Sequence, residues 1–188
     1  ATGVDLIVDD TPDVVTLSSF DLMRREIARL SLERLMADGR IHPARIEEVV
    51  ERVKKEVDQV VSQEGEKAIH ELVLQNVHPE LMKLLGRLRY RTSYGQNVLL
   101  HLKETAHISG MIAAELGLDQ RLAKRCAVFH DVGKAVSHEV EGPHALIGAE
   151  LAKRYGEPPE VVHSIEAHHE DVKPQNIYAV LTIIADSI

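Results

Sequence analysis

The sequence predicts a mainly α-helical fold, in which a small α+β segment and helical connectors precede an all-helical domain. Two short runs of branched apolar residues near the start predict strands, and from residue 22 onward apolar residues recur at helical spacing. No internal repeat or long linker interrupts this pattern. With 188 residues, of which 44% are hydrophobic, the chain is long enough to bury a core.

The first 40 residues predict a β-hairpin followed by a helix. Branched apolar residues alternate with acids over Thr2–Asp9, Asp10–Asp13 has the composition of a turn, and Val14–Leu17 reads as a second short strand. The helix then starts after Ser18, Ser19 or Asp21, each of which suits an N-cap, and Asp38-Gly39 ends it.

Helical connectors are expected from residue 41 to about residue 90. After His42-Pro43, branched residues form a stripe that steps by four and three: Ile46, Val50, Val53, Val57 and Val60. We expect this stripe to pack on the chain's own core, and a partner helix is the alternative. Gly65 could kink or end the helix, and an apolar face continues as far as Pro79.

From Asn97 onward the pattern is helical throughout. The single cysteine, Cys126, lies among apolar residues and is expected to pack in the core. One cysteine excludes an internal disulfide framework and fits a reducing compartment. The sequence has no run of 18 apolar residues and no leader pattern, so it predicts neither a membrane span nor secretion.

The charge balance is acidic, with 30 Asp and Glu against 22 Lys and Arg and a formal net charge of -8. This argues against a protein that holds nucleic acid by charge over its whole surface. Residues 81–103 are a local exception with five cations and no acids, namely Lys83, Arg87, Arg89, Arg91 and Lys103. Tyr90 and Tyr94 lie among them and could stack on unpaired bases. The alternative is a solvated helix end, or ion pairs with the acidic segment Glu47–Glu71.

Histidine is the residue type that calls for a chemical explanation. The chain has 11, and eight of them lie between His101 and His169. The pair His130-Asp131 could share one divalent cation where the backbone departs from helical geometry, and Gly133 offers such a place. Lys134 could then face the same site. Taken alone, the pair fits a surface helix end about as well.

Further candidate ligands surround this pair in the sequence. His101 lies on an apolar helix face, where it is either a metal ligand or a core histidine that is hydrogen-bonded to a carbonyl. His144 follows Gly142-Pro143 at an expected helix start, and His168-His169 ends another helical stretch. Asp186 lies in an apolar run, where an acid is rarely buried without a cation or a donor.

The order of these residues resembles the HD-domain metal-dependent phosphohydrolases. Among these phosphohydrolases, the ribonuclease Y family is the one to which three blocks of the sequence are similar: Arg87–Val98, His138–Gly142 and Ile165–His169. Thr2–Pro12 is similar to the second half of that family's KH domain. The resemblance implies a partial KH domain at residues 1–40, a helical connector at 41–90 and an HD domain at 91–188.

Two departures from the family pattern accompany this resemblance. The Gly-x-x-Gly loop, with which a KH domain clamps RNA phosphates, would lie before Ala1. The family continues past the last candidate ligand, Asp186, into further helix, so that support for this ligand would be reduced. We therefore expect the chain to be less active than a full-length member of the family.

The resemblance implies a metal-dependent endoribonuclease that cleaves single-stranded RNA and initiates bacterial mRNA decay. It also implies a homodimer, other RNA-decay proteins as partners, and an N-terminal membrane helix, absent from this chain, that anchors the full-length protein at the cytoplasmic face of the cell membrane. One alternative is an HD-type nucleotide or cyclic-nucleotide phosphohydrolase. The other is a non-catalytic assembly module with a structural metal.

The resemblance also assigns roles by position. The four-ligand core comprises His101, His130, Asp131 and Asp186, and the places that bind a second metal are His144, His168 and His169. Mixed imidazole and carboxylate ligands suit Mn²⁺, Fe²⁺ or Zn²⁺, whereas Mg²⁺ prefers oxygen. Seven ligands exceed one tetrahedral site, so two ions are expected rather than one. Hydroxide formed from a metal-bound water would attack phosphorus, with catalytic roles for His130, Asp131 and Lys134. The basic stretch, rather than the resemblance, predicts RNA-binding roles for Arg87, Arg89, Arg91 and Tyr94.

Overall fold

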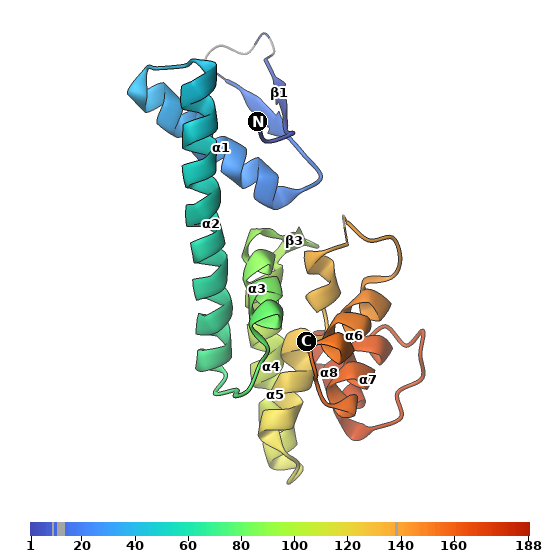
Figure 1. The fold of residues 1–188 in the computed structure, drawn as a ribbon. Helices are drawn as coiled ribbons and strands as arrows, with labels where there is room; N and C mark the ends of the chain where they lie inside the picture. The colour runs from blue at the N-terminus through green and yellow to red at the C-terminus, as the bar shows by residue number, and fades with distance from the viewer. Residues whose placement is uncertain (9, 11–13, 138) are drawn as a thin grey trace. The chain divides into compact units, whose positions relative to one another are not determined.

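Helices dominate the computed structural model, which describes residues 1–8, 10, 14–137 and 139–188. The strands among these residues form two short two-stranded sheets. The chain divides into two compact units, residues 1–60 and 61–188 (Figure 1). The mainly α-helical fold expected from the sequence is confirmed.

The first unit opens with the expected hairpin. Strands β1 (Asp5–Ile7) and β2 (Thr16–Ser18) are antiparallel, with Leu6 opposite Leu17. The turn expected at Asp10–Asp13 lies largely outside the described residues. Assignment of this unit's hairpin and first helix to a KH domain stays a prediction.

Helix α1 (Leu22–Asp38) is bounded by the signals that the sequence contains. Of the candidate N-caps, Asp21 does the capping, because its carboxylate accepts hydrogen bonds from the backbone N–H groups of Met23 and Arg24. Gly39 ends the helix with a φ of 67°, which glycine adopts at little cost.

Helix α2 (Pro43–Glu71) crosses the boundary between the units and continues through Gly65, so the expectation that Gly65 kinks or ends it is wrong. The reason is a close backbone approach. A Cβ atom at Gly65 would lie 1.9 Å from the carbonyl oxygen of Met82, which belongs to helix α3 (Pro79–Arg87). Gly65 therefore permits tight helix packing.

The middle of the branched stripe on α2 is buried in the single chain, whereas its ends, Ile46 and Val60, are half-buried. Val50, Val53 and Val57 are each at most 4% exposed. This burial agrees with the expectation that the stripe packs on the chain's own core, and no partner helix is needed to cover these side chains.

The second unit is a bundle of helices with one small hairpin. After α3 come the 3₁₀ helix η1 (Leu88–Tyr90), strands β3 (Thr92–Ser93) and β4 (Gln96–Asn97), and helices α4 (Val98–Glu115) and α5 (Gln120–Phe129). A second 3₁₀ helix, η2 (Val132–Ala135), precedes helices α6 (His144–Arg154), α7 (Pro159–Ala167) and α8 (Ile177–Asp186). The β3–β4 hairpin was not expected from the sequence.

The core of this unit lies between the end of α2 and helices α3 to α7, and α4, α5 and α7 also pack on α8 (Figure 1). Phe129, Leu102 and Ile165 are fully buried there. Cys126 is buried as expected, and burial raises the pKa of its thiol to about 12. None of the described helices is long and apolar enough to cross a membrane.

Candidate metal centre

The seven ligands expected from the sequence converge on one site from five helices. Most stand at helix ends, where the backbone leaves regular geometry. His101 lies in the first turn of α4, His130 caps the C-terminus of α5 and Asp131 follows it, His144 begins α6, His168 caps α7 with His169 next, and Asp186 ends α8. Helix packing therefore assembles a site that no single element contains.

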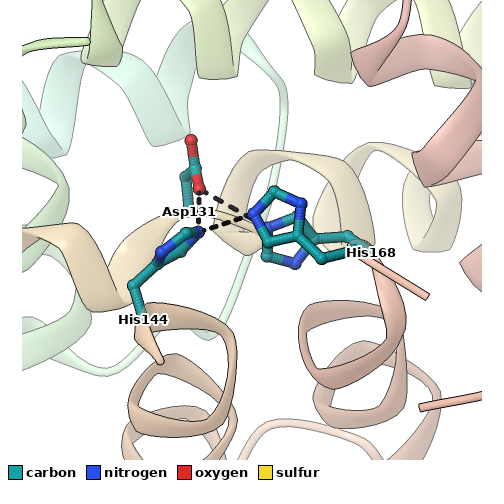
Figure 2. Close-up of side chains that lie close together, drawn as sticks. Asp131, His144 and His168 are labelled. Atoms are coloured by element: carbon teal, nitrogen blue, oxygen red, sulfur yellow. Dashed lines mark hydrogen bonds and ion pairs between the residues drawn. The ribbon is translucent and has the colours of Figure 1, made fainter. Parts of the chain in front are cut away.

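Asp131 lies at the centre of one group of donors. Its Oδ1 atom is 3.1 Å from Nε2 of His144 and 3.5 Å from Nε2 of His168. Figure 2 shows the three side chains pointing toward one another. His169 joins them, with its Nε2 atom 2.9 Å from Nε2 of His144. Each of the four residues offers a ligand atom within 4.8 Å of the others. Three imidazoles and a carboxylate at this separation could hold one transition-metal cation.

A second group shares the same carboxylate. Asp131 Oδ2 lies 3.6 Å from Nε2 of His130, and His101, His130 and Asp131 also place ligand atoms within 4.8 Å of one another. Asp186 Oδ1 contacts both histidines, at 2.8 Å from Nε2 of His101 and 3.3 Å from Nε2 of His130. The two oxygens of Asp131 thus face different donor sets.

The buried histidines are oriented for ligation by their backbones. Nδ1 of His130 lies 2.7 Å from the carbonyl oxygen of Ala127, and Nδ1 of His168 lies 2.6 Å from that of Ile165. Since a carbonyl only accepts, each Nδ1 carries a proton, and each Nε2 can present a lone pair to a cation when one is bound. This is the usual way in which a protein orients a metal-binding histidine.

Three buried atoms in the site lack an oriented hydrogen bond among the described residues: His130 Nε2, His168 Nε2 and Asp131 Oδ1. Buried polar atoms are normally satisfied, and leaving one unsatisfied costs about 1 to 3 kcal/mol. A divalent cation would satisfy all three, because each is a lone-pair donor. The residues present therefore fit a metal centre.

The carboxylates of the site stay ionised. Burial by itself would raise the pKa of Asp131, but the neighbouring His144, His168 and Lys134 outweigh it and hold that pKa far below its ordinary value. The pKa of Asp186 is likewise lowered by His101 and His130 in spite of burial. Both groups are therefore anionic at neutral pH, as cation ligands must be.

The neighbouring groups of the site also shift the pKa values of two further histidines. Burial, followed by the neighbouring imidazoles of His168 and His144, lowers the pKa of His169, which favours its neutral, ligating form. The pKa of His101 is raised, chiefly by its hydrogen bond to Asp186. A cation bound to both residues would replace the shared proton.

Gly133 and Lys134 complete the local geometry around Asp131. Nζ of Lys134 donates a hydrogen bond of 2.6 Å to Oδ2 of Asp131. A Cβ atom at Gly133 would lie 2.0 Å from the carbonyl oxygen of His144. Glycine is required there because the η2 backbone approaches the start of α6, and this contact brings His144 to Asp131.

An open cleft of about 240 Å³ leads to the site. Its walls include Lys134 and the candidate ligands His101, Asp131, His169 and Asp186. The β3–β4 hairpin contributes Ser93, Tyr94 and Gln96. The sequence singled out Tyr94 but missed Ser93 and Gln96. Strands of two residues carry no alternation that could have revealed the hairpin.

The cations expected to bind RNA are mostly engaged within the protein. Arg89 forms an ion pair of 2.6 Å with Glu64, and Lys103 pairs with Glu71, so for these two the alternative of pairing with the acidic segment applies. Arg87 lies 3.7 Å from Glu139. Arg91 donates to the backbone carbonyl of Lys134 at 2.8 Å. Their roles in binding RNA remain predictions.

Comparison with known proteins agrees with this geometry. Residues 98–188 match the family model of the HD domain. Over the whole chain, the sequence is 61% identical to ribonuclease Y of Thermoanaerobacter pseudethanolicus and 63% identical to the ribonucleases Y of Thermobifida fusca and Acidothermus cellulolyticus.

The extent of these matches is uneven. The chain is covered completely, but it spans only 37 to 38% of the length of these three relatives. No solved structure matches the chain at a significant level. Over its whole length the chain is therefore similar to one part of the ribonucleases Y, and residues 98–188, which contain the candidate ligands, match the HD domain.

Proposed function

We propose that this chain carries the catalytic site of a metal-dependent endoribonuclease that cleaves single-stranded RNA and so initiates mRNA decay. The observation that carries the proposal is the shared carboxylate of Asp131, which lies between two sets of histidine donors. The relatives named ribonuclease Y supply the substrate class. The family's homodimer, its RNA-decay partners and its anchoring at the cytoplasmic face of the membrane belong to the same proposal.

Two divalent cations fit the donors better than one. His101, His130, Asp131 and Asp186 would hold the first, and Asp131, His144, His168 and His169 the second. The mixture of imidazole and carboxylate favours Mn²⁺, Fe²⁺ or Zn²⁺, with Mg²⁺ the poorer match. When bound, such ions supply Lewis acidity, which activates water near neutral pH and stabilises charge on phosphoryl oxygens.

The chain's own residues would set up this chemistry. Carbonyl oxygens of Ala127 and Ile165 hold the imidazoles of His130 and His168 in fixed orientations. Lys134 lies beside Asp131 at the cleft, where its ammonium group can offset negative charge that develops on the phosphate. A phosphodiester that enters the cleft would therefore lie next to the candidate ligands and the Lys134 ammonium group at the same time.

The experiment that tests the proposal compares the chain with its Asp131→Ala variant on 5′-labelled single-stranded RNA in Mn²⁺ or Mg²⁺. We expect internal cuts that leave a 5′-phosphate and a 3′-hydroxyl, and a loss of at least about a hundredfold in rate in the variant. Asp171→Ala is the matched control, because Asp171 is an exposed acid outside the metal groups.

Three results would contradict the proposal. Undiminished cutting by Asp131→Ala would exclude the metal centre as the origin of the activity. Turnover of free or cyclic nucleotides far faster than RNA would instead favour an HD-type nucleotide phosphohydrolase. Less than about 0.2 metal per chain after reconstitution would exclude a metal-dependent catalytic site, since such a site binds its ion stoichiometrically.

A further inference from the structure

The β3–β4 hairpin carries an exposed tyrosine at the edge of the metal cleft. Thr92 pairs with Asn97 and Ser93 with Gln96, so Tyr94 and Gly95 form the two-residue turn. The Tyr94 side chain is fully exposed, yet the residue lines the same cleft as Asp131 and Lys134. Its ring is therefore available to a molecule that occupies the cleft.

The turn itself does not account for tyrosine at this position. Both central residues have positive φ, 50° for Tyr94 and 84° for Gly95, which is the pattern of a type I′ turn. Such turns favour Asn-Gly, because asparagine tolerates the left-handed region better than a bulky side chain does. Folding of the hairpin would be served better by asparagine, so the aromatic ring calls for another explanation.

The hairpin is fixed to the backbone that carries the catalytic groups. The Arg91 guanidinium donates to the carbonyl oxygen of Lys134 at 2.8 Å, and the Asn97 side-chain amide donates to the carbonyl oxygen of Arg89 at 2.6 Å. The N–H of Val98, the first residue of α4, donates to the Arg91 carbonyl. These bonds attach the base of the hairpin to the backbone of Lys134 and to the start of α4, which carries His101.

The chemistry of the cleft indicates what this ring would contact. A phosphate at the metal centre belongs to a nucleotide whose base is attached nearby, and aromatic rings bind bases of any sequence by stacking. Ser93 and Gln96, on the same hairpin, add polar groups beside the ring. The hairpin therefore presents a stacking face and hydrogen-bonding groups next to the site that would hold phosphate.

We infer that Tyr94 stacks on the nucleobase next to the phosphate bound at the metal centre, and that Arg91 is the positioning residue that holds the hairpin in register with that phosphate. The inference rests on the proposed function, because it takes the substrate to be RNA. It gives Arg91 a role different from the phosphate contact expected from the sequence.

The turn geometry supplies a sharp test, because Tyr94→Asn removes the ring and suits the turn. We expect Tyr94→Asn to unfold at the same or a higher temperature, while its KM for single-stranded RNA rises about tenfold. Tyr94→Phe keeps the ring and should stay within about twofold of the unmodified chain. An unchanged KM in Tyr94→Asn would overturn the inference.

Abasic RNA separates stacking from other effects of the substitution. An abasic nucleotide is placed in turn on either side of the scissile phosphate. When the abasic nucleotide lies at the stacked position, the KM of the unmodified chain should rise about tenfold. The KM of Tyr94→Asn, which already lacks the stacking ring, should not rise further. A further tenfold rise in the KM of Tyr94→Asn with the abasic nucleotide at either position would contradict stacking.

A binding measurement distinguishes failure of this inference from failure of the proposed function. RNA containing 2-aminopurine should lose more fluorescence with the unmodified chain than with Tyr94→Asn, whether or not it is cut. If quenching differs but no RNA is cleaved, the stacking residue stands and the endoribonuclease proposal falls. If the two proteins quench equally, the role of Tyr94 is overturned.

For Arg91, the variant Arg91→Lys retains the charge but cannot reproduce the geometry of the guanidinium. If Arg91 positions the hairpin, this variant should show the same KM increase as Tyr94→Asn, and combining the two should add little. An Arg91→Lys variant with an unchanged KM would contradict the positioning role.

Discussion

At the scale of single residues, Asp131 explains why the histidines of this chain cluster. Each of its oxygens faces a different set of imidazoles, and the carboxylate is 4% exposed. A buried anion in this position needs cations or donors around it. Lys134 supplies one of them, and bound metal would supply the rest.

Replacing Lys134 with methionine should separate metal binding from catalysis. Lys134→Met removes a positive charge 2.6 Å from Asp131, so cation binding should be kept or strengthened. The kcat for RNA should fall by about a hundredfold, because a donor that stabilises phosphoryl charge is lost. Metal content by elemental analysis and single-turnover kinetics measure the two effects.

Lys153→Met, at an exposed position on α6, is the control and should leave both quantities unchanged. If Lys134→Met cleaved RNA at the full rate, the assigned role would be wrong.

The candidate ligands could be predicted from the sequence, whereas their mutual geometry could not. His101 and Asp186 attract notice because polar residues on apolar faces need partners, and they prove to be each other's partners, at 2.8 Å. The division of donors around Asp131 depends on how five helices pack. The local charge pattern could not predict that Arg89 pairs with Glu64, because this ion pair depends on how two segments distant in the sequence pack together.

At the scale of elements, close backbone contacts at glycine hold the site together. Gly133 lets η2 approach the start of α6, and Gly65 lets α2 approach α3. The sequence marked both as breaks in helical geometry. It could not show which segment lies against each glycine, and the expectation that Gly65 kinks or ends the helix is wrong for that reason.

Gly133→Ala should damage fold and metal centre together. The new Cβ would meet the His144 carbonyl at 2.0 Å, and because backbone cannot rotate away, η2 and α6 must separate. We expect a loss of about 2 to 3 kcal/mol in the free energy of unfolding, measured in urea, and reduced metal content.

The matched control is Gly110→Ala, inside α4, where the added Cβ would meet the flexible Lys124 side chain. The Lys124 side chain must shift, because its Cγ atom would lie 2.8 Å from the new Cβ, but a side chain moves more easily than backbone and alanine favours helix. This variant should therefore lose clearly less stability than Gly133→Ala. Equal stability of the two variants would contradict the packing argument.

The pair Arg125–Glu157 joins three segments of the second unit. The guanidinium donates two hydrogen bonds to the buried Glu157 carboxylate and two more to the carbonyl oxygens of Gln75 and Asn76. Arg125→Met would leave a carboxylate that is 1% exposed without its cation.

We therefore expect Arg125→Met to lower the free energy of unfolding by about 3 kcal/mol or more. Arg121→Met, at an exposed position of the same helix, should change it by less than about 0.5 kcal/mol. Urea denaturation of both variants checks the difference. A neutral Arg125→Met would show that the pair adds nothing to stability.

At the scale of the whole molecule, metal binding and folding are coupled. The buried atoms of His130, His168 and Asp131 that lack an oriented hydrogen bond among the described residues would be satisfied by cations in the folded chain alone. Chelation should therefore lower the Tm by roughly 5 to 10 °C at cation concentrations about a hundredfold above Kd.

Calorimetry with EDTA and then with excess Mn²⁺ measures this effect, which should be reversible. The Asp131→Asn variant should be insensitive to both additions. A chain whose Tm did not respond to chelation, although it had been loaded with metal, would contradict the coupling.

The central claim is that Asp131 is shared by two cations, and anomalous diffraction from crystals loaded with Mn²⁺ tests it most directly. We predict two anomalous peaks that flank Asp131, one contacting His101, His130 and Asp186 and the other contacting His144, His168 and His169. A chain fully loaded with Mn²⁺ that shows only one peak, or none, within coordination distance of Asp131 would contradict the claim.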